Sequence, residues 1–242
     1  MGILRVVTYN IHKGVQGIGP SRRLEIHNLA HAVEQFDADI VCLQEVRNHH
    51  RKLEKQFTRW PALNQAGYLL PEGYESVYRT NAVTRHGEHG NALLSRWPVL
   101  SSAHTDVSDH RFEQRGLLHA LLLVQGVEVH VVVVHFGLIH AGRKRQVKRL
   151  GEYIARELPP ASPLIVAGDF NDWGAKLLRP MADLDLKTFD SLRLPTYPAR
   201  LPLLHLDRIY VRGLRPLNAC VPHGRIWTRM SDHLPLIAEL EL

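Results

Sequence analysis

Polar residues that can bind a cation or move a proton follow a series of apolar, β-branched runs in this sequence. Six runs end in segments whose chemically active side chains are Asn, Glu, His or Asp. In chain order these segments carry Asn10, Glu45, His135, Asp169 with Asn171, Asp207, and Asp232 with His233. One polar strand ending is commonplace, but six in series predict a polar site assembled from strand ends at one edge of a sheet.

The surrounding pattern predicts the elements that must position these side chains. Apolar runs predict strands at residues 4–9, 39–46, 75–78, 91–95, 117–124, 127–135, 164–167, 206–211 and 234–240. Gln125-Gly126 predicts a tight hairpin turn between two of them. Helical periodicity predicts helices at residues 22–36, with Ser21 as the N-cap, at about 142–158, and more weakly within 47–57.

The order of these elements predicts the fold class. Strand–helix–strand patterns occur near the start and again in the middle, with antiparallel strands between them. Both faces of such sheets need covering, so we expect two packed sheets with helices on the outside. No low-complexity linker divides the chain, and residues 1–242 are expected to form a single domain.

Composition limits the classes of protein to which the chain can belong. Its 45% hydrophobic and 22% charged residues are ordinary for a globular protein, and no apolar run approaches the roughly 20 residues that span a bilayer. The N-terminus lacks a signal-peptide layout, Cys42 is expected in the core, and a disulfide with Cys220 is not expected. The cytoplasm is therefore the expected compartment. A net charge of +6 favours polyanions or anionic membranes as partners, without choosing between them.

Taken together, the motifs resemble those of the endonuclease/exonuclease/phosphatase superfamily, which includes DNase I-like nucleases, sphingomyelinase-type phosphodiesterases and inositol phosphatases. Leu43-Gln44-Glu45, Gly168-Asp169-Phe170-Asn171 and Ser231-Asp232-His233 occur in the family's order, and Gly90 to Arg96 is similar to its strand ending in Leu-Ser-Arg. Thr196-Tyr197-Pro198 is more like the sphingomyelinase-like and small bacterial members. The resemblance implies a four-layer αββα sandwich with a divalent-metal phosphoesterase site at one rim.

The same resemblance implies a cation site. Asn10, Glu45 and Asp232 are its candidate metal ligands, and ligation by oxygen alone favours Mg²⁺ or Mn²⁺ over zinc. A hard cation of this kind would neutralise the charge of a phosphodiester, which otherwise repels hydroxide. Considered alone, Glu45 could equally be a strand-end carboxylate that pairs with Arg47 or a nearby amide.

The remaining polar endings resemble the family's catalytic residues. Asp169 would orient or deprotonate the attacking water, Asn171 would donate to a phosphoryl oxygen, and His135 would be a proton donor to the leaving group. His233 would face the phosphate with Asp207 orienting it. In isolation, Gly-Asp-Phe-Asn could instead be a turn whose side chains bond their own backbone, and Asp207 could form a simple salt bridge.

Several further positions concern substrate contact and departures from the family's pattern. Asn91 is expected to contact the substrate, and Arg115 either contacts a phosphate or is a structural arginine. Some nuclease members carry a second acidic ligand two positions after the asparagine, where this chain has His12. In DNase I-like nucleases a glutamate before the Leu-Ser-Arg strand supports the second histidine, whereas here the matching position is His89, beside Glu88.

Two basic segments indicate which kinds of anionic partner the protein could bind. Residues 143–149 carry five basic side chains in seven, which on a helix are expected to form a solvated face, and residues 47–59 place five more beside Trp60. The second composition suits a nucleic-acid backbone or an anionic membrane surface, with peripheral contact. The favoured function is thus a Mg²⁺- or Mn²⁺-dependent phosphodiesterase acting on nucleic acid or a phospholipid headgroup. A phosphomonoesterase and a non-catalytic polyanion-binding module are the alternatives.

Overall fold

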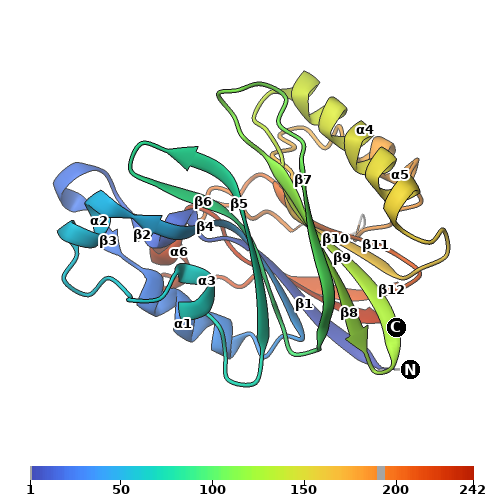
Figure 1. The fold of residues 1–242 in the computed structure, drawn as a ribbon, viewed down its shortest axis with the longest axis horizontal. Helices are drawn as coiled ribbons and strands as arrows, with labels where there is room; N and C mark the ends of the chain where they lie inside the picture. The colour runs from blue at the N-terminus through green and yellow to red at the C-terminus, as the bar shows by residue number, and fades with distance from the viewer. Residues whose placement is uncertain (1, 190–193) are drawn as a thin grey trace.

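Two large sheets form the centre of the protein (Figure 1). The structure is a computed structural model and describes residues 2–189 and 194–242. The first sheet has the strand order β12-β13-β1-β4-β6-β5, and the second has the order β11-β10-β9-β8-β7. Both are mixed, because β1 is parallel to β4 and β9 is parallel to β10 while their other pairings are antiparallel.

The first sheet is built from β1 (Ile3–Asn10), β4 (Ile40–His50), β5 (Glu75–Thr84), β6 (Gly87–Ser95), β12 (Arg215–Cys220) and β13 (Leu236–Glu241). The second comprises β7 (Val99–Asp106), β8 (Gly116–Val124), β9 (Val127–His135), β10 (Leu164–Asp169) and β11 (Asp207–Arg212). A two-stranded ribbon of β2 (Val15–Gln16) and β3 (Arg23–Leu24) follows β1. The nine predicted strands are confirmed, with differences of a few residues at their ends.

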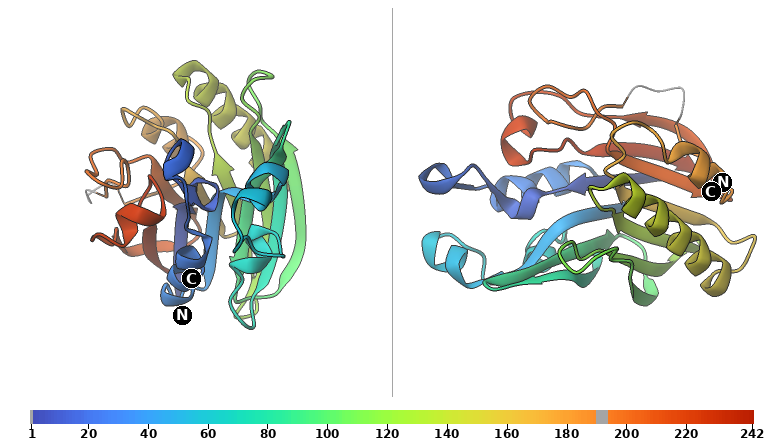
Figure 2. Two further views of the ribbon diagram at one scale, coloured as in Figure 1. Left: turned by 90° about the vertical axis from the view of Figure 1, so that its left-hand side faces the viewer. Right: turned by 90° about the horizontal axis from the view of Figure 1, so that it is seen from above.

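Helices cover the outer faces of the two sheets. The first outer layer contains α1 (Ile26–Gln35), and the opposite one contains α4 (His140–Glu157) and α5 (Leu178–Ala182). Figure 1 shows these helices on opposite sides of the two sheets, and Figure 2 gives two further views. The short helices are α2 (Arg51–Gln56), α3 (Gln65–Tyr68) and α6 (Trp227–Met230). This arrangement confirms the four-layer αββα sandwich. Within the described residues, no helix has the length and apolar character needed to span a bilayer.

Three apolar clusters hold the layers together. The inner faces of both sheets share one cluster that includes Leu4, Leu118 and Val131, all fully buried. A second cluster joins the first sheet to α1, and a third joins the second sheet to α4. The hairpin at Gln125-Gly126 is confirmed, since both residues have positive φ, as a two-residue turn between twisted strands requires.

Two local predictions were wrong. The first helix begins at Ile26 rather than at residue 22, and Ser21 does not cap it because Arg23 and Leu24 pair with β2 instead. Arg143 does not lie on a solvated face: its side chain is buried and donates hydrogen bonds to the carbonyls of Gly137 and Leu138. The helix that carries it therefore uses one of its basic residues to anchor the segment after β9.

Candidate active site

The strand order brings the predicted residues to one edge of the sandwich. Parallel strands β9 and β10 end side by side, so that His135 lies opposite Asp169, and antiparallel β11 begins there with Asp207 opposite Asp169. In the first sheet β1 ends at Asn10 beside Gln44, and β13 begins next to β1. Ser231 Oγ donates to the Asn10 carbonyl at 2.6 Å, which fixes the segment before β13.

One hydrogen bond joins the two sheets at this edge. Asn10 Nδ2, at the end of the first sheet's central strand, donates to Asp169 Oδ2 of the second sheet at 3.0 Å. Gly168 before it has φ +156°, and an added Cβ would lie 1.9 Å from the Val134 carbonyl oxygen. Glycine is therefore required for β10 to approach β9 closely enough to place Asp169 at the rim.

His233 lies between two carboxylates. Its Nδ1 is 2.7 Å from Asp207 Oδ2, and its Nε2 is 3.7 Å from Asp169 Oδ2. Burial alone would lower the pKa of this imidazole, but attraction by Asp207 and Asp169 outweighs it and raises the pKa to about 10. His233 is therefore a buried imidazolium at neutral pH.

Asp169 and His135 form the other half of this group. His135 Nε2 lies 3.5 Å from Asp169 Oδ2. Burial raises the pKa of Asp169 to about 7, with His233 opposing the rise and Asp207 adding to it. Burial and the nearby Arg115 guanidinium hold the pKa of His135 well below its ordinary value. The site thus contains one charged and one neutral imidazole beside a carboxyl group poised near neutral pH.

The Gly-Asp-Phe-Asn segment also forms the turn that its composition allows. The Asn171 backbone N–H donates to Asp169 Oδ1 at 2.9 Å, and Asn171, with φ 47°, donates its side-chain amide to the Phe136 carbonyl at 2.9 Å. The turn and the site are therefore the same structure: the Asx-type bond fixes the orientation of Asp169.

Glu45 and Asp232 lie on either side of His12. His12 Nδ1 is 3.1 Å from Asp232 Oδ1 and 4.0 Å from Glu45 Oε2, and Lys13 Nζ pairs with Glu45. Burial would raise the pKa of Glu45, but the nearby cationic groups, Lys13 foremost, outweigh it and hold the pKa well below its usual range. Glu45 thus pairs with Lys13 and not with Arg47, a partner that the sequence did not reveal.

The three proposed metal ligands fit a hard cation by chemistry. Both carboxylates are ionised, because hydrogen bonding and charge from His12 also lower the pKa of Asp232 against the effect of burial. Asn10 adds an amide oxygen that accepts the His12 backbone N–H at 3.1 Å. A separate buried group, Asp169 with Asp207 and His233, also brings potential ligand atoms within 4.8 Å of one another. In that group, His233 Nδ1 and Asp207 Oδ2 already bond to each other at 2.7 Å.

Several residues acquire roles that their sequence patterns did not indicate. Thr196 is fully buried and its hydroxyl donates to Asp207 Oδ2 at 2.6 Å. The Tyr197 ring lies 4.9 Å from that of His233 and contacts Trp173 edge-on at 5.7 Å. Glu88 pairs with Asn48 and His49 and so does not support His135. Nothing in the spacing of Thr196 and Asp207 predicts their contact.

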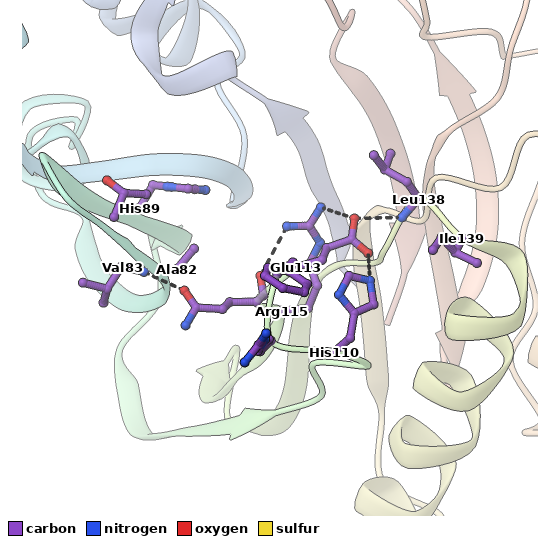
Figure 3. A pocket seen from close by; sticks show the side chains of 12 residues that line it. Ala82, Val83, His89, His110, Glu113, Arg115, Leu138 and Ile139 are labelled. Atoms are coloured by element: carbon purple, nitrogen blue, oxygen red, sulfur yellow. Dashed lines mark hydrogen bonds and ion pairs between the residues drawn. The ribbon is translucent and has the colours of Figure 1, made fainter.

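Asn91 and Arg115 differ in their access to the site. Asn91 is fully buried and its amide donates to the carbonyls of Gly116 and Val133, so it joins the sheets. Arg115 lies in a cleft of about 590 Å³, where Glu113 accepts hydrogen bonds from Arg115 Nη2 and the Leu138 N–H (Figure 3). Its Nε donates to the Phe136 carbonyl at 3.2 Å. Arg115 therefore presents charge to the cleft while bracing its wall.

Comparison with known proteins agrees with this geometry. The sequence profile described as "Endonuclease/Exonuclease/phosphatase family" matches residues 7–233, from β1 to His233. The chain belongs to this family. It is 39% identical to the uncharacterized protein YbhP of Escherichia coli K12 over 246 residues, which covers 98% of this chain and 96% of YbhP.

Several solved structures share the fold. An endonuclease/exonuclease/phosphatase from Beutenbergia cavernae has a TM-score of 0.79 at 19% identity, covering 99% of this chain and 72% of that one. Sphingomyelinase C from Streptomyces griseocarneus has a TM-score of 0.68 at 20% identity, with 99% of each chain covered. TDP2 of D. rerio, complexed with a single-strand DNA product, has a TM-score of 0.70 at 15% identity and full coverage of both chains.

Proposed function

We propose that this protein is a Mg²⁺- or Mn²⁺-dependent phosphodiesterase that hydrolyses its substrate by in-line attack of water. The observation that carries the proposal is the juxtaposition of a buried Asp207–His233–Asp169 group with the ionised carboxylates of Glu45 and Asp232. Asn10, Glu45 and Asp232 are the proposed metal ligands. A bound divalent cation would neutralise phosphate charge and polarise the phosphoryl group.

The chain's own residues supply the proton chemistry. Asp169, whose pKa is raised to about 7, is matched to accepting a proton from the attacking water near neutral pH. His233 carries its proton on a buried ring held by Asp207, and its proposed role is to donate a hydrogen bond to a phosphoryl oxygen.

The sequence predicts that His135 donates a proton to the leaving group, but we propose a different role. Its lowered pKa favours a neutral ring, which can donate a hydrogen bond to the leaving oxygen but is a weak source of a proton. Asn171 is proposed to help orient Asp169 and the substrate, and Arg115 to attract the substrate's negative charge. Asn91 was expected to contact the substrate, but no such contact is proposed because its side chain is buried between the two sheets.

The proposed substrate class follows from the protein's net charge and from its structural similarity to two solved structures. The net charge of +6 suits an anionic phosphodiester, either nucleic acid or an anionic phospholipid presented at a membrane surface. One structure of this fold holds a DNA product and another is a sphingomyelinase, so both classes belong in a screen. Cys42 and Cys220 are free thiols, which fits the reducing cytoplasm as the proposed compartment.

Hydrolysis of bis(p-nitrophenyl) phosphate tests the proposal. We expect release of p-nitrophenol that requires Mg²⁺ or Mn²⁺, stops with EDTA, and falls by about 10²–10⁴-fold in His233→Ala and Asp169→Ala. A parallel p-nitrophenyl phosphate assay separates diesterase from monoesterase activity. Equal rates for all proteins, with and without EDTA, would refute the proposed function.

A further inference from the structure

A small cationic hollow adjoins the proposed metal ligands. It has a volume of about 190 Å³ and is lined by His12, Lys13, Val15, Gly17, Arg22, Arg47, His50 and Leu53. Five of these eight residues carry a basic or imidazole side chain, and none is acidic. His12 and Lys13 also contact Asp232 and Glu45, so the hollow opens beside the place where the substrate phosphate would be processed.

Three separate elements build this hollow. The segment after β1 supplies His12 and Lys13, the turn of the β2–β3 ribbon supplies Arg22, and the end of β4 supplies Arg47. Gly17 in that turn has φ +87°, and a Cβ there would lie 2.5 Å from the Ser21 carbonyl oxygen. The glycine therefore allows the tight turn that brings Arg22 over the hollow.

The cations of the hollow outnumber their anionic partners. Lys13 pairs with Glu45, and Arg23 beside the hollow pairs with Glu25. Among the described residues, by contrast, no carboxylate lies within ion-pair distance of Arg22 or Arg47. Arg47 Nε is also buried without a hydrogen-bond partner among the same residues. A buried donor of this kind is costly unless an acceptor reaches it.

The electrostatics of Arg47 point the same way. Arg22 and Arg47 line the same small hollow, so two guanidinium groups of like charge face one space. His50 accepts the Leu53 N–H through Nδ1, which leaves its Nε2–H as a neutral donor. A surface arginine that is merely solvated would have neither a dehydrated Nε nor a second guanidinium beside it.

We propose that this hollow binds a second phosphate group of the substrate, next to the phosphodiester that is cleaved. Two guanidinium groups and an imidazole donor suit a doubly charged, multi-oxygen anion, and arginine binds phosphate oxygens in bidentate geometry. This inference rests on the proposed function for the position of the cleaved bond. It defines the substrate class as phosphodiesters that carry an additional phosphate, whether a nucleotide chain or a phospholipid headgroup supplies it.

Two matched substrate pairs test the subsite. Thymidine 5′-(p-nitrophenyl phosphate) is compared with the same compound bearing a 3′-phosphate, and dispersed short-chain phosphatidylglycerol is compared with phosphatidylglycerophosphate. We expect the second phosphate to raise kcat/KM about 10-fold or more in one pair, which identifies the source. In the double variant Arg22→Gln/Arg47→Gln, the ratio of kcat/KM with the second phosphate to kcat/KM without it should fall close to one. Arg225→Gln/Arg229→Gln, which removes two exposed arginines from a different hollow, should preserve it.

A binding measurement separates failure of the subsite from failure of the proposed function. By calorimetry in EDTA, thymidine 3′,5′-bisphosphate should bind wild type about 10-fold more tightly than thymidine 5′-monophosphate, and the double variant should lose the difference. Thermal unfolding confirms that each variant is folded. Preferential binding without hydrolysis of any substrate would refute the phosphodiesterase while retaining the subsite. Hydrolysis with no preference in wild type, or a preference that survives Arg22→Gln/Arg47→Gln, would overturn the subsite.

Discussion

His233 shows how single contacts define the chemistry of the site. Asp207 holds Nδ1, Asp169 faces Nε2, and Thr196 in turn donates to the Asp207 oxygen that binds the ring. A carboxylate with two donors on one oxygen is restrained in rotation, so the imidazole it holds is restrained as well. Thr196 is therefore a positioning residue that acts through Asp207.

Removing the Thr196 hydroxyl should weaken catalysis without removing any group that touches substrate. We expect Thr196→Val to lower kcat about 10-fold with little change in KM, since one charge-assisted hydrogen bond is lost. Thr196→Ser should restore most of kcat because it keeps the donor. If Thr196→Ser is as slow as Thr196→Val at equal thermal stability, the hydroxyl does not position Asp207.

Glu45 should link metal binding to stability. A ligand that binds only the folded state at 100 times its Kd stabilises it by about 2.7 kcal/mol, so Mg²⁺ or Mn²⁺ should raise the Tm of wild type. Glu45→Gln should abolish this rise, whereas Glu34→Gln, an exposed carboxylate change on α1, should not. A metal-induced shift that persists in Glu45→Gln would exclude this residue as a ligand.

At the scale of elements, the two sheets are joined by polar contacts as well as by the apolar core. Asn91 on β6 of the first sheet donates to the carbonyls of Gly116 on β8 and Val133 on β9 of the second. Asn10 makes another link, at the rim. Because β9 also carries His135, the Asn91 contacts help to fix the relative position of the two halves of the site.

Loss of the Asn91 side chain should destabilise the sandwich. Asn91→Ala removes two buried hydrogen bonds and leaves two carbonyls to compete for other donors. We expect a fall of about 2–4 kcal/mol in the free energy of unfolding, measured by urea denaturation. Asn218→Ala on β12, where the side chain is exposed, should change it by less than about 0.5 kcal/mol. Equal effects of the two changes would exclude a bridging role.

At the scale of the whole molecule, histidines away from the rim couple stability to pH. His119 on β8 contacts His130 through Nε2 and Tyr153 of α4 through Nδ1, each at 2.9 Å. Burial, reinforced by His130, lowers the pKa of His119 from 6.5 to about 4. At this residue the unfolded chain therefore binds more protons than the folded protein between these two pH values, so the contribution of His119 to stability rises with pH across that window.

Urea unfolding at several pH values tests this coupling. His119 should disfavour folding increasingly as the pH is lowered from about 6.5 toward 4, whereas Asp169, with its pKa raised to about 7, acts with the opposite sign in wild type and variants alike. His119→Gln should make the free energy of unfolding rise less steeply with pH between about 4 and 6.5. His31→Gln, which changes an exposed histidine on α1, should leave this slope unchanged. The slope should not vanish in His119→Gln, because burial also lowers the pKa of His89 to about 4. An identical slope in wild type and His119→Gln would contradict the prediction.

The sequence alone determined the elements with strong apolar patterns and the order of polar residues at their ends. Strands such as β9 could be predicted because nearly every side chain is buried. The edge strands β7 and β12 could not, because their exposed side chains lack the apolar alternation that marks a strand. The start of α1 was misplaced for a related reason: only tertiary pairing with β2 keeps Arg23 and Leu24 out of the helix.

Tertiary structure alone decided which polar residues meet and which are buried between the layers. The Lys13–Glu45 pair, the Thr196–Asp207 bond and the buried positions of Asn91 and Arg143 depend on strand register and on the packing of one layer against another. Residue types state what a side chain can do, whereas burial and neighbouring charge set its protonation state and its partners. Spacing along a chain carries no information about distances across two sheets, so these contacts become visible only in the folded molecule.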